Sequence, residues 1–406
     1  MARSAKNDSV KEPLVHITKR SSVSVGRGLL IRAAAIVIAF ICCGLVAFLL
    51  IEKIRSDPGR IVEFYKCFFT GTFSTADKTL KFFKNLAVLL IISLAVTPAF
   101  RMRFWNIGAE GQVLMGVLGC IAVAYYCGDA VTSGTLPRGL FIVMMLAGSV
   151  LASAIWAVIP SIFKAFWNTN ETLFTLMMNY IAISLTGFFI QTWIPNGNSS
   201  LGRLDVATLF PLPAQDELAK MRESAASGGF FEKTGLYFTE HAPYLFAIGV
   251  AIVITVLLYI YLYYSKHGYE ISVVGESENT AKYIGINVKK VTVRTNILCG
   301  TICGVAGFLL GAGLNQSVTV DAVGGQGFTA IMVSWLAKFN PAIMPVTSGL
   351  VTFLNEGAGE VSTVFDVRGA LPNIIVGIIL FFVIGCEFFI NYKLHFRKSV
   401  KKEAES

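Results

Sequence analysis

The sequence predicts an all-α integral membrane protein built as a polytopic helical bundle. Of its 406 residues, 54% are hydrophobic and only 15% are charged, and the mean hydropathy is +0.65. Long apolar runs recur along the chain, and about 20 apolar residues suffice for one helical crossing of a bilayer. Basic residues collect in the two chain ends, as is typical of segments on the inner side of a membrane.

Ten apolar runs predict about ten transmembrane helices. Two of them, 326–338 and 342–356, are short and are separated by Asn340-Pro341, which breaks a helix. This pair could form two short spans or one re-entrant hairpin. The ten runs are 29–51, 82–102, 111–127, 139–160, 171–191, 243–264, 293–313, 326–338, 342–356 and 371–390.

The chain ends predict the orientation. The N-terminal tail, 1–28, contains six Lys or Arg and two acidic residues, and the C-terminal tail, 391–406, contains five and two. Both tails are therefore expected in the cytoplasm, which requires an even number of crossings. Residues 52–84, expected outside, are an exception with seven basic and four acidic residues. The first 28 residues are mostly polar, which favours a retained first helix over a cleaved signal peptide.

One membrane domain is expected over 29–390. Two hydrophilic segments interrupt it: an external loop at 192–241, with a short helix near 215–223, and a cytoplasmic loop at 265–292. No low-complexity tract or soluble domain is evident between the apolar runs.

The sequence lacks the motifs of several function classes. No Gly-x4-Gly-Lys-Ser/Thr loop is present to hold ATP phosphates. The four histidines are dispersed and the eight cysteines lack Cys-x-x-Cys spacing, so we expect no metal, no cofactor and no catalytic residues. In a chain this apolar, the net charge of +9 reflects membrane orientation better than nucleic-acid binding. A transport subunit is expected rather than an enzyme.

Polar residues lie between two apolar runs at 106–112, which reads Asn-Ile-Gly-Ala-Glu-Gly-Gln. Asn106 and Glu110 are four residues apart, so on a helix they would share one face. A carboxylate at mid-bilayer costs about 2.5–3.5 kcal/mol and is usually functional. The glycines permit a broken or closely packed backbone. We interpret Asn106, Glu110 and Gln112 as candidates for a substrate pathway.

The alternative for this segment is a hydrated cytoplasmic turn. Arg101 and Arg103 just upstream favour it, because basic residues collect at inner membrane edges. The residue chemistry alone does not separate the two interpretations.

A second polar pattern begins at Asn168. Asn168 and Glu171 form a capping box for the helix that follows. Glu171, Thr175 and Asn179 also lie at four-residue spacing, which gives a polar stripe on a membrane helix. We expect this stripe to face the pathway or a paired subunit.

The cytoplasmic loop contains a short predicted helix within 273–286. Ser277 or Asn279 could cap its start, and Gly285 could end it. A short capped helix of this kind suits docking into a groove of a partner, although a solvated loop helix would have the same pattern. Its small apolar face would comprise Ala281, Ile284 and Tyr283.

Two glycine patterns follow. The first has three- and four-residue steps along one helix, which is typical of close helix packing, and it consists of Gly300, Gly304, Gly307 and Gly311. The second, at 324–328, reads Gly-Gly-Gln-Gly-Phe. It could let backbone approach a ligand beside Phe328 or form an ordinary turn.

Four of these motifs, in order, resemble the larger permease subunit of nucleoside-type ATP-binding-cassette (ABC) importers, within the branched-chain amino acid, simple sugar and nucleoside permease family. Residues 104–112 match "F-x-N-I-G-A-E-G-Q", and 170–180 resemble "N-E-x-x-x-T-L-M-L-N-Y". Residues 275–286 resemble the coupling segment "G-x-N-P-x-A-A-R-Y-x-G-I", and 324–341 resemble "G-x-G-F…N-P".

The coupling segment departs from the family wording at three places. Ser277-Glu278 precedes Asn279, Thr280 stands where Pro is frequent, and Lys282 replaces the common Arg. The resemblance implies that this segment contacts an ATPase through Gly275, Glu276, Asn279, Ala281, Tyr283 and Gly285.

The resemblance implies nucleoside uptake across a bacterial cytoplasmic membrane by alternating access. Implied partners are a smaller paralogous permease in a heterodimer, a double-cassette ATP-binding subunit and a substrate-binding lipoprotein. Riboflavin or a simple sugar remains an alternative substrate. An ion-coupled secondary transporter, with Glu110 or Glu171 as coupling carboxylate, is the alternative from another class.

Overall fold

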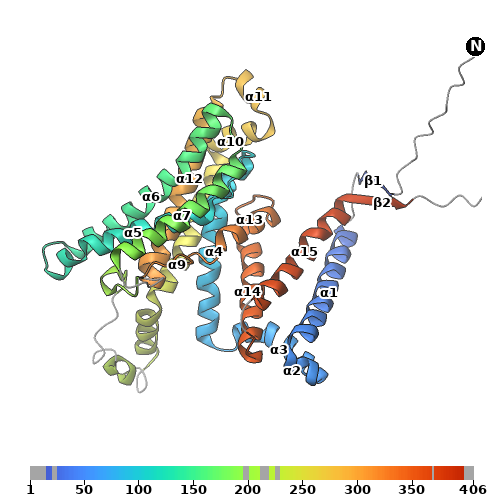
Figure 1. The fold of residues 1–406 in the computed structure, drawn as a ribbon, viewed down its shortest axis with the longest axis horizontal. Helices are drawn as coiled ribbons and strands as arrows, with labels where there is room; N and C mark the ends of the chain where they lie inside the picture. The colour runs from blue at the N-terminus through green and yellow to red at the C-terminus, as the bar shows by residue number, and fades with distance from the viewer. Residues whose placement is uncertain are drawn as a thin grey trace, which may run out of the picture. The chain divides into compact units, whose positions relative to one another are not determined.

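The computed structural model describes residues 15–20, 25–194, 201–210, 219–224, 229–367 and 370–396. It confirms an all-α polytopic architecture, to which it adds two short strands (Figure 1). Every predicted span coincides with a helix. These helices are α1 (Val25–Leu50), α4 (Ala76–Arg101), α5 (Ala109–Thr132), α6 (Arg138–Trp167), α7 (Glu171–Trp193), α9 (Phe230–Tyr264), α12 (Val288–Phe308), α13 (Gln326–Leu336), α14 (Met344–Phe365) and α15 (Leu371–Asn391).

Eight helices in the described ranges are long and apolar enough to cross a membrane. Neither α13 nor α14 is among them. With 11 residues, α13 is about 16 Å long and cannot cross a hydrocarbon core of about 30 Å. The α14 helix has 22 residues, but Asn355, Glu356 and Glu360 lower its hydropathy.

The chain forms two compact units. One comprises residues 1–71 and 354–406, and the other comprises Thr72–Phe353. In the second unit α12 packs against α4, α5 and α6. The predicted packing glycines provide these contacts: Gly300 and Gly304 lie against α6, and Gly307 and Gly311 lie against α5. An added Cβ at Gly304 would be 2.6 Å from Val150 Cα, so only glycine permits this approach.

The described part of the first unit contains α1, α2 (Glu52–Ser56), α3 (Ile61–Thr70) and α15, with the end of α14. Strand β1 (Val15–Lys19) precedes α1, β2 (Tyr392–Phe396) follows α15, and the two strands pair antiparallel. The strands therefore bring the N-terminal end of α1 and the C-terminal end of α15 together. This pairing agrees with the expectation that both tails lie on one side of the membrane.

A non-helical segment, 316–325, connects α12 to α13. It begins where Leu204 N donates to Gln316 O at 2.8 Å, beside residues 201–210, which follow the outer end of α7. After α13, the Phe339 ring stacks on Phe100 near the opposite end of the bundle, where α4 ends. The segment and α13 thus run together from one end of α12 towards the other. We call this pair the broken crossing. The α14 helix then returns towards the start of α4, where Phe353 stacks on Phe73.

Candidate functional site

The segment 106–112 forms the start of α5 and the turn before it. The helix begins at Ala109, so Asn106 and Glu110 do not share a helix face as the spacing predicted. The turn interrupts the helical register because Asn106 Oδ1 accepts from Gly108 N at 3.0 Å. Gln112 Nε2 donates to the same oxygen at 3.2 Å. All three polar side chains are buried: Asn106, Glu110 and Gln112.

The Glu110 carboxylate binds the N-terminal end of α13. Gly325 N donates to Oε1 at 2.8 Å, and Gly327 N donates to Oε2 at 2.7 Å. These amides lie where a helix leaves N–H groups without partners and where its dipole favours a negative charge. The buried carboxylate is thus compensated by helix amides of the broken crossing.

The polar stripe of α7 faces the same segment. Thr175 Oγ1 accepts from Ile107 N at 3.1 Å, while Asn179 accepts from Gly111 N and donates to Ile107 O, each at 2.9 Å. The third member of the stripe, Glu171, forms an ion pair with Lys164 at 2.9 Å. In this chain, the stripe therefore secures the turn before α5.

Two glycines are required by these close approaches. A Cβ at Gly111 would be 2.8 Å from Asn179 Oδ1, and one at Gly327 would be 2.6 Å from Glu110 Cα. Next to Gly327, the Phe328 side chain is 42% exposed. Gly327 thus permits a close approach of backbone to backbone within the chain, whereas Gly324 and Gly325 adopt positive φ values of 62° and 75°.

Two polar atoms of the cluster have no hydrogen-bond partner in the described part of the chain. They are Asn106 Nδ2, a donor, and Gln112 Oε1, an acceptor. Unpaired buried polar atoms are costly, at about 1–3 kcal/mol each, and are usually satisfied by water or a ligand. The pair could bind a group that both accepts and donates, such as a hydroxyl or an amide edge.

The loop 265–292, predicted to be cytoplasmic, folds into two helices, α10 (Lys266–Glu276) and α11 (Glu278–Tyr283). Of the two predicted caps, Ser277 is the N-cap of α11, where its Oγ accepts from Thr280 N at 3.2 Å. Gly285, with φ +84°, follows the helix as predicted. Both helices lie together at one end of the second unit (Figure 1).

The predicted docking residues divide into two groups. The side chains of Glu276 and Asn279 are exposed, as is Gly285, and Tyr283 is 92% exposed. Ala281 is fully buried, so the expected apolar face of Ala281, Ile284 and Tyr283 does not exist as one surface. The short helix places Ala281 on its inner face, whereas Tyr283 and Ile284 lie on the outer one.

Gly275 and Glu270 attach α10 to the membrane helices. At Gly275 an added Cβ would collide with the carbonyl oxygen of Arg101, at the end of α4. Glu270 Oε2 accepts from Arg294 Nη2 of α12 at 2.8 Å. Movement of α10 would therefore be transmitted to α4 and α12.

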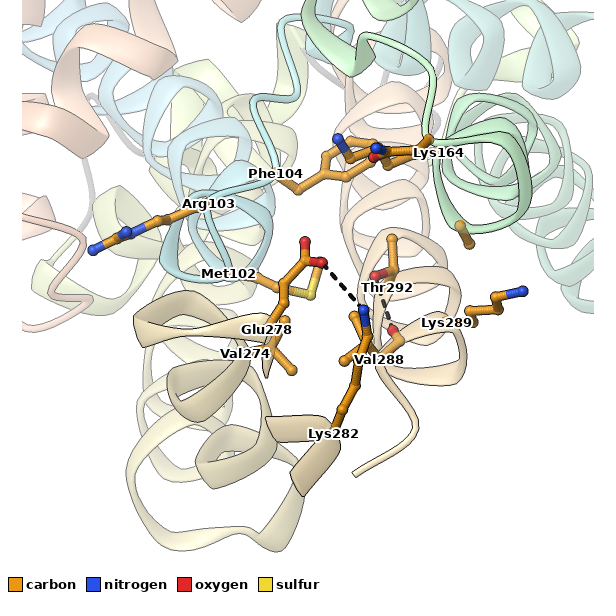
Figure 2. Close-up of a pocket in the computed structure, with 12 residues that line it drawn as sticks. Met102, Arg103, Phe104, Lys164, Val274, Glu278, Lys282, Val288, Lys289 and Thr292 are labelled. Atoms are coloured by element: carbon orange, nitrogen blue, oxygen red, sulfur yellow. Dashed lines mark hydrogen bonds and ion pairs between the residues drawn. The ribbon is translucent and has the colours of Figure 1, made fainter. Parts of the chain in front are cut away.

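A pocket of about 280 Å³ lies between α10–α11 and the ends of α4, α6 and α12 (Figure 2). Glu278 and Lys282 point towards each other within it, 4.0 Å apart. Arg103 and Lys289 extend outward at its rim. The pocket lies directly against the predicted docking segment, and its lining is mainly basic, with four basic side chains and one acidic side chain.

The Glu270–Arg294 ion pair predicts a pH dependence. The hydrogen bond from Arg294, followed by its positive charge, lowers the pKa of Glu270 below the ordinary value of 4.5. The pair's contribution to stability is therefore complete above that value and is lost as the pH falls through the lowered pKa. Thermal unfolding of the purified protein in detergent should show a difference between wild type and Glu270→Gln at pH 7 that shrinks towards pH 3. A constant difference would mean that the pair does not stabilise the fold.

Comparison with known proteins identifies the class. Residues 79–384 match the family described as branched-chain amino acid transport system / permease component, and the chain belongs to this family. It is a multi-pass permease of the nucleoside and sugar ABC importer type, a transport subunit.

Three relatives illustrate the range of solutes named for proteins similar to this chain. A glucose ABC transporter permease protein, TsgB13 of Haloferax volcanii, is 27% identical, covering 88% of each chain. The guanosine ABC transporter permease protein NupP of Bacillus subtilis is 26% identical over 79% of this chain and 84% of its own. The nucleoside ABC transporter permease protein NupB of Lactococcus lactis is 23% identical over 83% and 87%. No solved structure matches the chain significantly.

Sequence reasoning missed the partners of the site. It selected Glu110 but not the Gly325 and Gly327 amides that the carboxylate binds, and it did not pair Glu270 with Arg294. The glycine cluster at 324–327 was the available signal, because its Gly327 permits a close approach that a residue with a Cβ does not allow. In the described ranges, no group of three His, Cys, Asp or Glu side chains could hold a metal ion.

Proposed function

We propose that this chain is the permease subunit of an importer for nucleosides, driven by a separate ATPase that docks on α10–α11. The observation that carries the ATPase site is the exposed tip at Tyr283, on a helical pair anchored through Gly275 and Glu270 to two membrane helices. A partner that moves this tip would move α4 and α12.

The pathway is proposed to pass the segment 106–112 when the helices open. Asn106 Nδ2 and Gln112 Oε1 provide one donor and one acceptor, which suit the hydroxyl and amide groups of a nucleoside. Glu110 has a different proposed role, because both of its oxygens already accept from α13. By binding the start of α13, Glu110 holds that helix beside Asn106 and Gln112.

Glucose-type sugars are the second candidate substrate. The 27% identity to a glucose permease supports them, whereas guanosine and nucleoside permeases among the relatives support nucleosides. Riboflavin has no support of this kind. Because the chain belongs to an ABC permease family, we do not propose that it is an ion-coupled secondary transporter.

The proposed assembly contains a smaller paralogous permease, a double-cassette ATP-binding subunit and a substrate-binding lipoprotein in a bacterial cytoplasmic membrane. Support for the second permease comes from relatives that occur in pairs within one organism, such as NupP and NupQ of Bacillus subtilis.

Uptake by cells that lack this chain tests the substrate. Radiolabelled guanosine, uridine, glucose and riboflavin are supplied separately to deletion cells, to complemented cells and to the parent strain. We expect a large loss of nucleoside uptake, restored by the wild-type chain, with glucose and riboflavin uptake unchanged. Loss of glucose uptake alone would assign the sugar, and no loss for any of the four would contradict the proposed substrate range.

A charge at Tyr283 should uncouple transport. Tyr283→Glu places a carboxylate on a residue that is 92% exposed, so the fold should tolerate it while ATPase docking is lost. We expect uptake to fall about tenfold or more, the effect of losing about 1.4 kcal/mol of docking free energy. Co-purification of the ATPase measures docking, and Tyr283→Phe is the matched control.

Ala281→Arg provides a contrasting variant. It should lower the yield of folded protein, because Ala281 is fully buried. Normal co-purification of the ATPase with Tyr283→Glu would show that the exposed tip is not the docking surface.

A further inference from the structure

A second pocket lies at the other end of α12 from the docking segment. It has a volume of about 200 Å³ and is formed by the end of α12, residues 203–210 and the beginning of the membrane span of α9. Its side chains include two aromatic rings and two amides, from Phe210, Tyr244, Asn315 and Gln316, with Arg203 beside them.

The backbone of α12 is irregular at this pocket. The α-helix changes to a π-helical turn at η4 (Leu309–Asn315), and Gln316 follows with φ +53°. Such turns are rare and often occur at functional sites. A left-handed conformation is uncommon for a non-glycine residue, and it persists where the surroundings enforce it.

Backbone hydrogen bonds hold the pocket together. Leu209 N donates to Ala312 O at 3.1 Å, and Leu204 N donates to Gln316 O at 2.8 Å. The Phe210 ring contacts Phe246 edge-on, with centroids 5.5 Å apart. The pocket is therefore preformed, which lowers the entropic cost of binding.

The lining suits an uncharged solute with a ring. Aromatic faces at Phe210 and Tyr244 can stack on a base or on the apolar face of a sugar. Asn315 and Gln316 each offer both a donor and an acceptor. Arg203 is 3.5 Å from Asp205, whose carboxylate balances its charge, and a second cation, Lys84 Nζ, lies 5.8 Å from the centroid of the Tyr244 ring. The rings and amides suit a solute whose ring bears hydroxyl and amide groups, and the two cations disfavour a positively charged one.

We propose that this pocket is a binding subsite for the nucleoside on the side at which it arrives, before it reaches the segment 106–112. The inference rests on the proposed function. It is supported by position, because the docking segment precedes α12 and η4 follows it, and the 28 residues of α12 and η4 together span about 40 Å.

Thiol labelling tests the subsite. Asn315→Cys, in the full-length chain within intact cells, is labelled with a membrane-impermeant maleimide, and labelling of wild type is subtracted for the native cysteines. Excess guanosine should slow labelling about fivefold or more, as expected for a solute that occupies the pocket above its Kd. Gln191→Cys, on an exposed position near the outer end of α7, is the control and should be unaffected.

Uptake kinetics provide a second readout. Gln316→Ala and Tyr244→Leu should raise the KM for guanosine about tenfold each, with membrane levels of the chain unchanged. Gln316→Asn keeps an amide and tolerates the left-handed backbone, so it should largely preserve the wild-type KM.

The outcomes separate the two proposals. If wild-type cells take up guanosine while Asn315→Cys is unprotected and the variants keep a normal KM, the subsite is wrong and the substrate stands. If glucose protects Asn315→Cys and guanosine does not, the subsite binds sugar, and both the nucleoside assignment and its subsite are overturned. If wild-type cells take up none of the tested solutes, the proposed function is wrong, and the subsite, which rests on it, is overturned as well.

Discussion

Glu110→Leu should abolish uptake and destabilise the protein. The substitution leaves the amides of Gly325 and Gly327 without acceptors in a buried site. Each unsatisfied donor costs about 1–3 kcal/mol, so we expect a loss of about 2–6 kcal/mol in the free energy that holds α13 in place. Fluorescence-detected size exclusion after a temperature series measures the stability, and guanosine uptake measures the activity.

Glu110→Gln separates charge from hydrogen bonding. A glutamine offers one oxygen acceptor in place of two, so one of the two amides keeps its bond and partial uptake should remain. Asp129→Leu removes an exposed acidic residue near the other end of α5 and serves as the matched control. Full uptake by Glu110→Leu would mean that the carboxylate is dispensable and that 106–112 is an ordinary hydrated turn.

Gly304→Leu should prevent assembly of the helical bundle. An added Cβ would lie 2.6 Å from Val150 Cα and 3.0 Å from Ser149 O, both on α6. These are backbone atoms, so the helices must separate to accept the side chain. Overpacking typically costs about 1–3 kcal/mol, and lost contacts along α6 and α12 add to that figure. The yield of monodisperse protein in detergent is the measurement.

Gly249→Leu is the control for that substitution. Gly249 lies in α9, and nothing lies within 4 Å of an added Cβ there. A leucine at this position should therefore be tolerated in yield and in uptake. Equal behaviour of the two variants would show that the contact between α6 and α12 does not limit folding.

Local signals predicted the elements of this protein well. Apolar runs located each membrane helix because burial in lipid demands about 20 consecutive apolar residues whatever the rest of the chain does. The terminator at Gly285 followed from the sequence, and Ser277 was one of the two caps that it allowed. The predicted N-cap at Asn168 was wrong, because Asn168 ends α6 with φ 52° and Asn170 caps α7. The ordered motifs identified the permease family, which the family match confirms.

Pairwise contacts over long sequence separations did not follow from the sequence. Glu110 binds amides more than 200 residues away, and the α7 stripe binds Ile107 and Gly111 about 70 residues upstream. The prediction that Asn106 and Glu110 share a helix face was wrong. Asn106 lies in a turn before the helix, where its side chain accepts a hydrogen bond from Gly108 N.

The sequence by itself thus determined the class of protein, its helices and the residues that carry polar chemistry in an apolar chain. Only the tertiary structure decided which partner each of those residues has. The physical reason is that a buried polar group must be satisfied by whichever donor or acceptor the packing brings within 3 Å. That packing is set by where helices can approach closely, at Gly111, Gly304 and Gly327. The spacing of the α12 glycines predicted a close contact at Gly304, but it did not say which helix would make that contact.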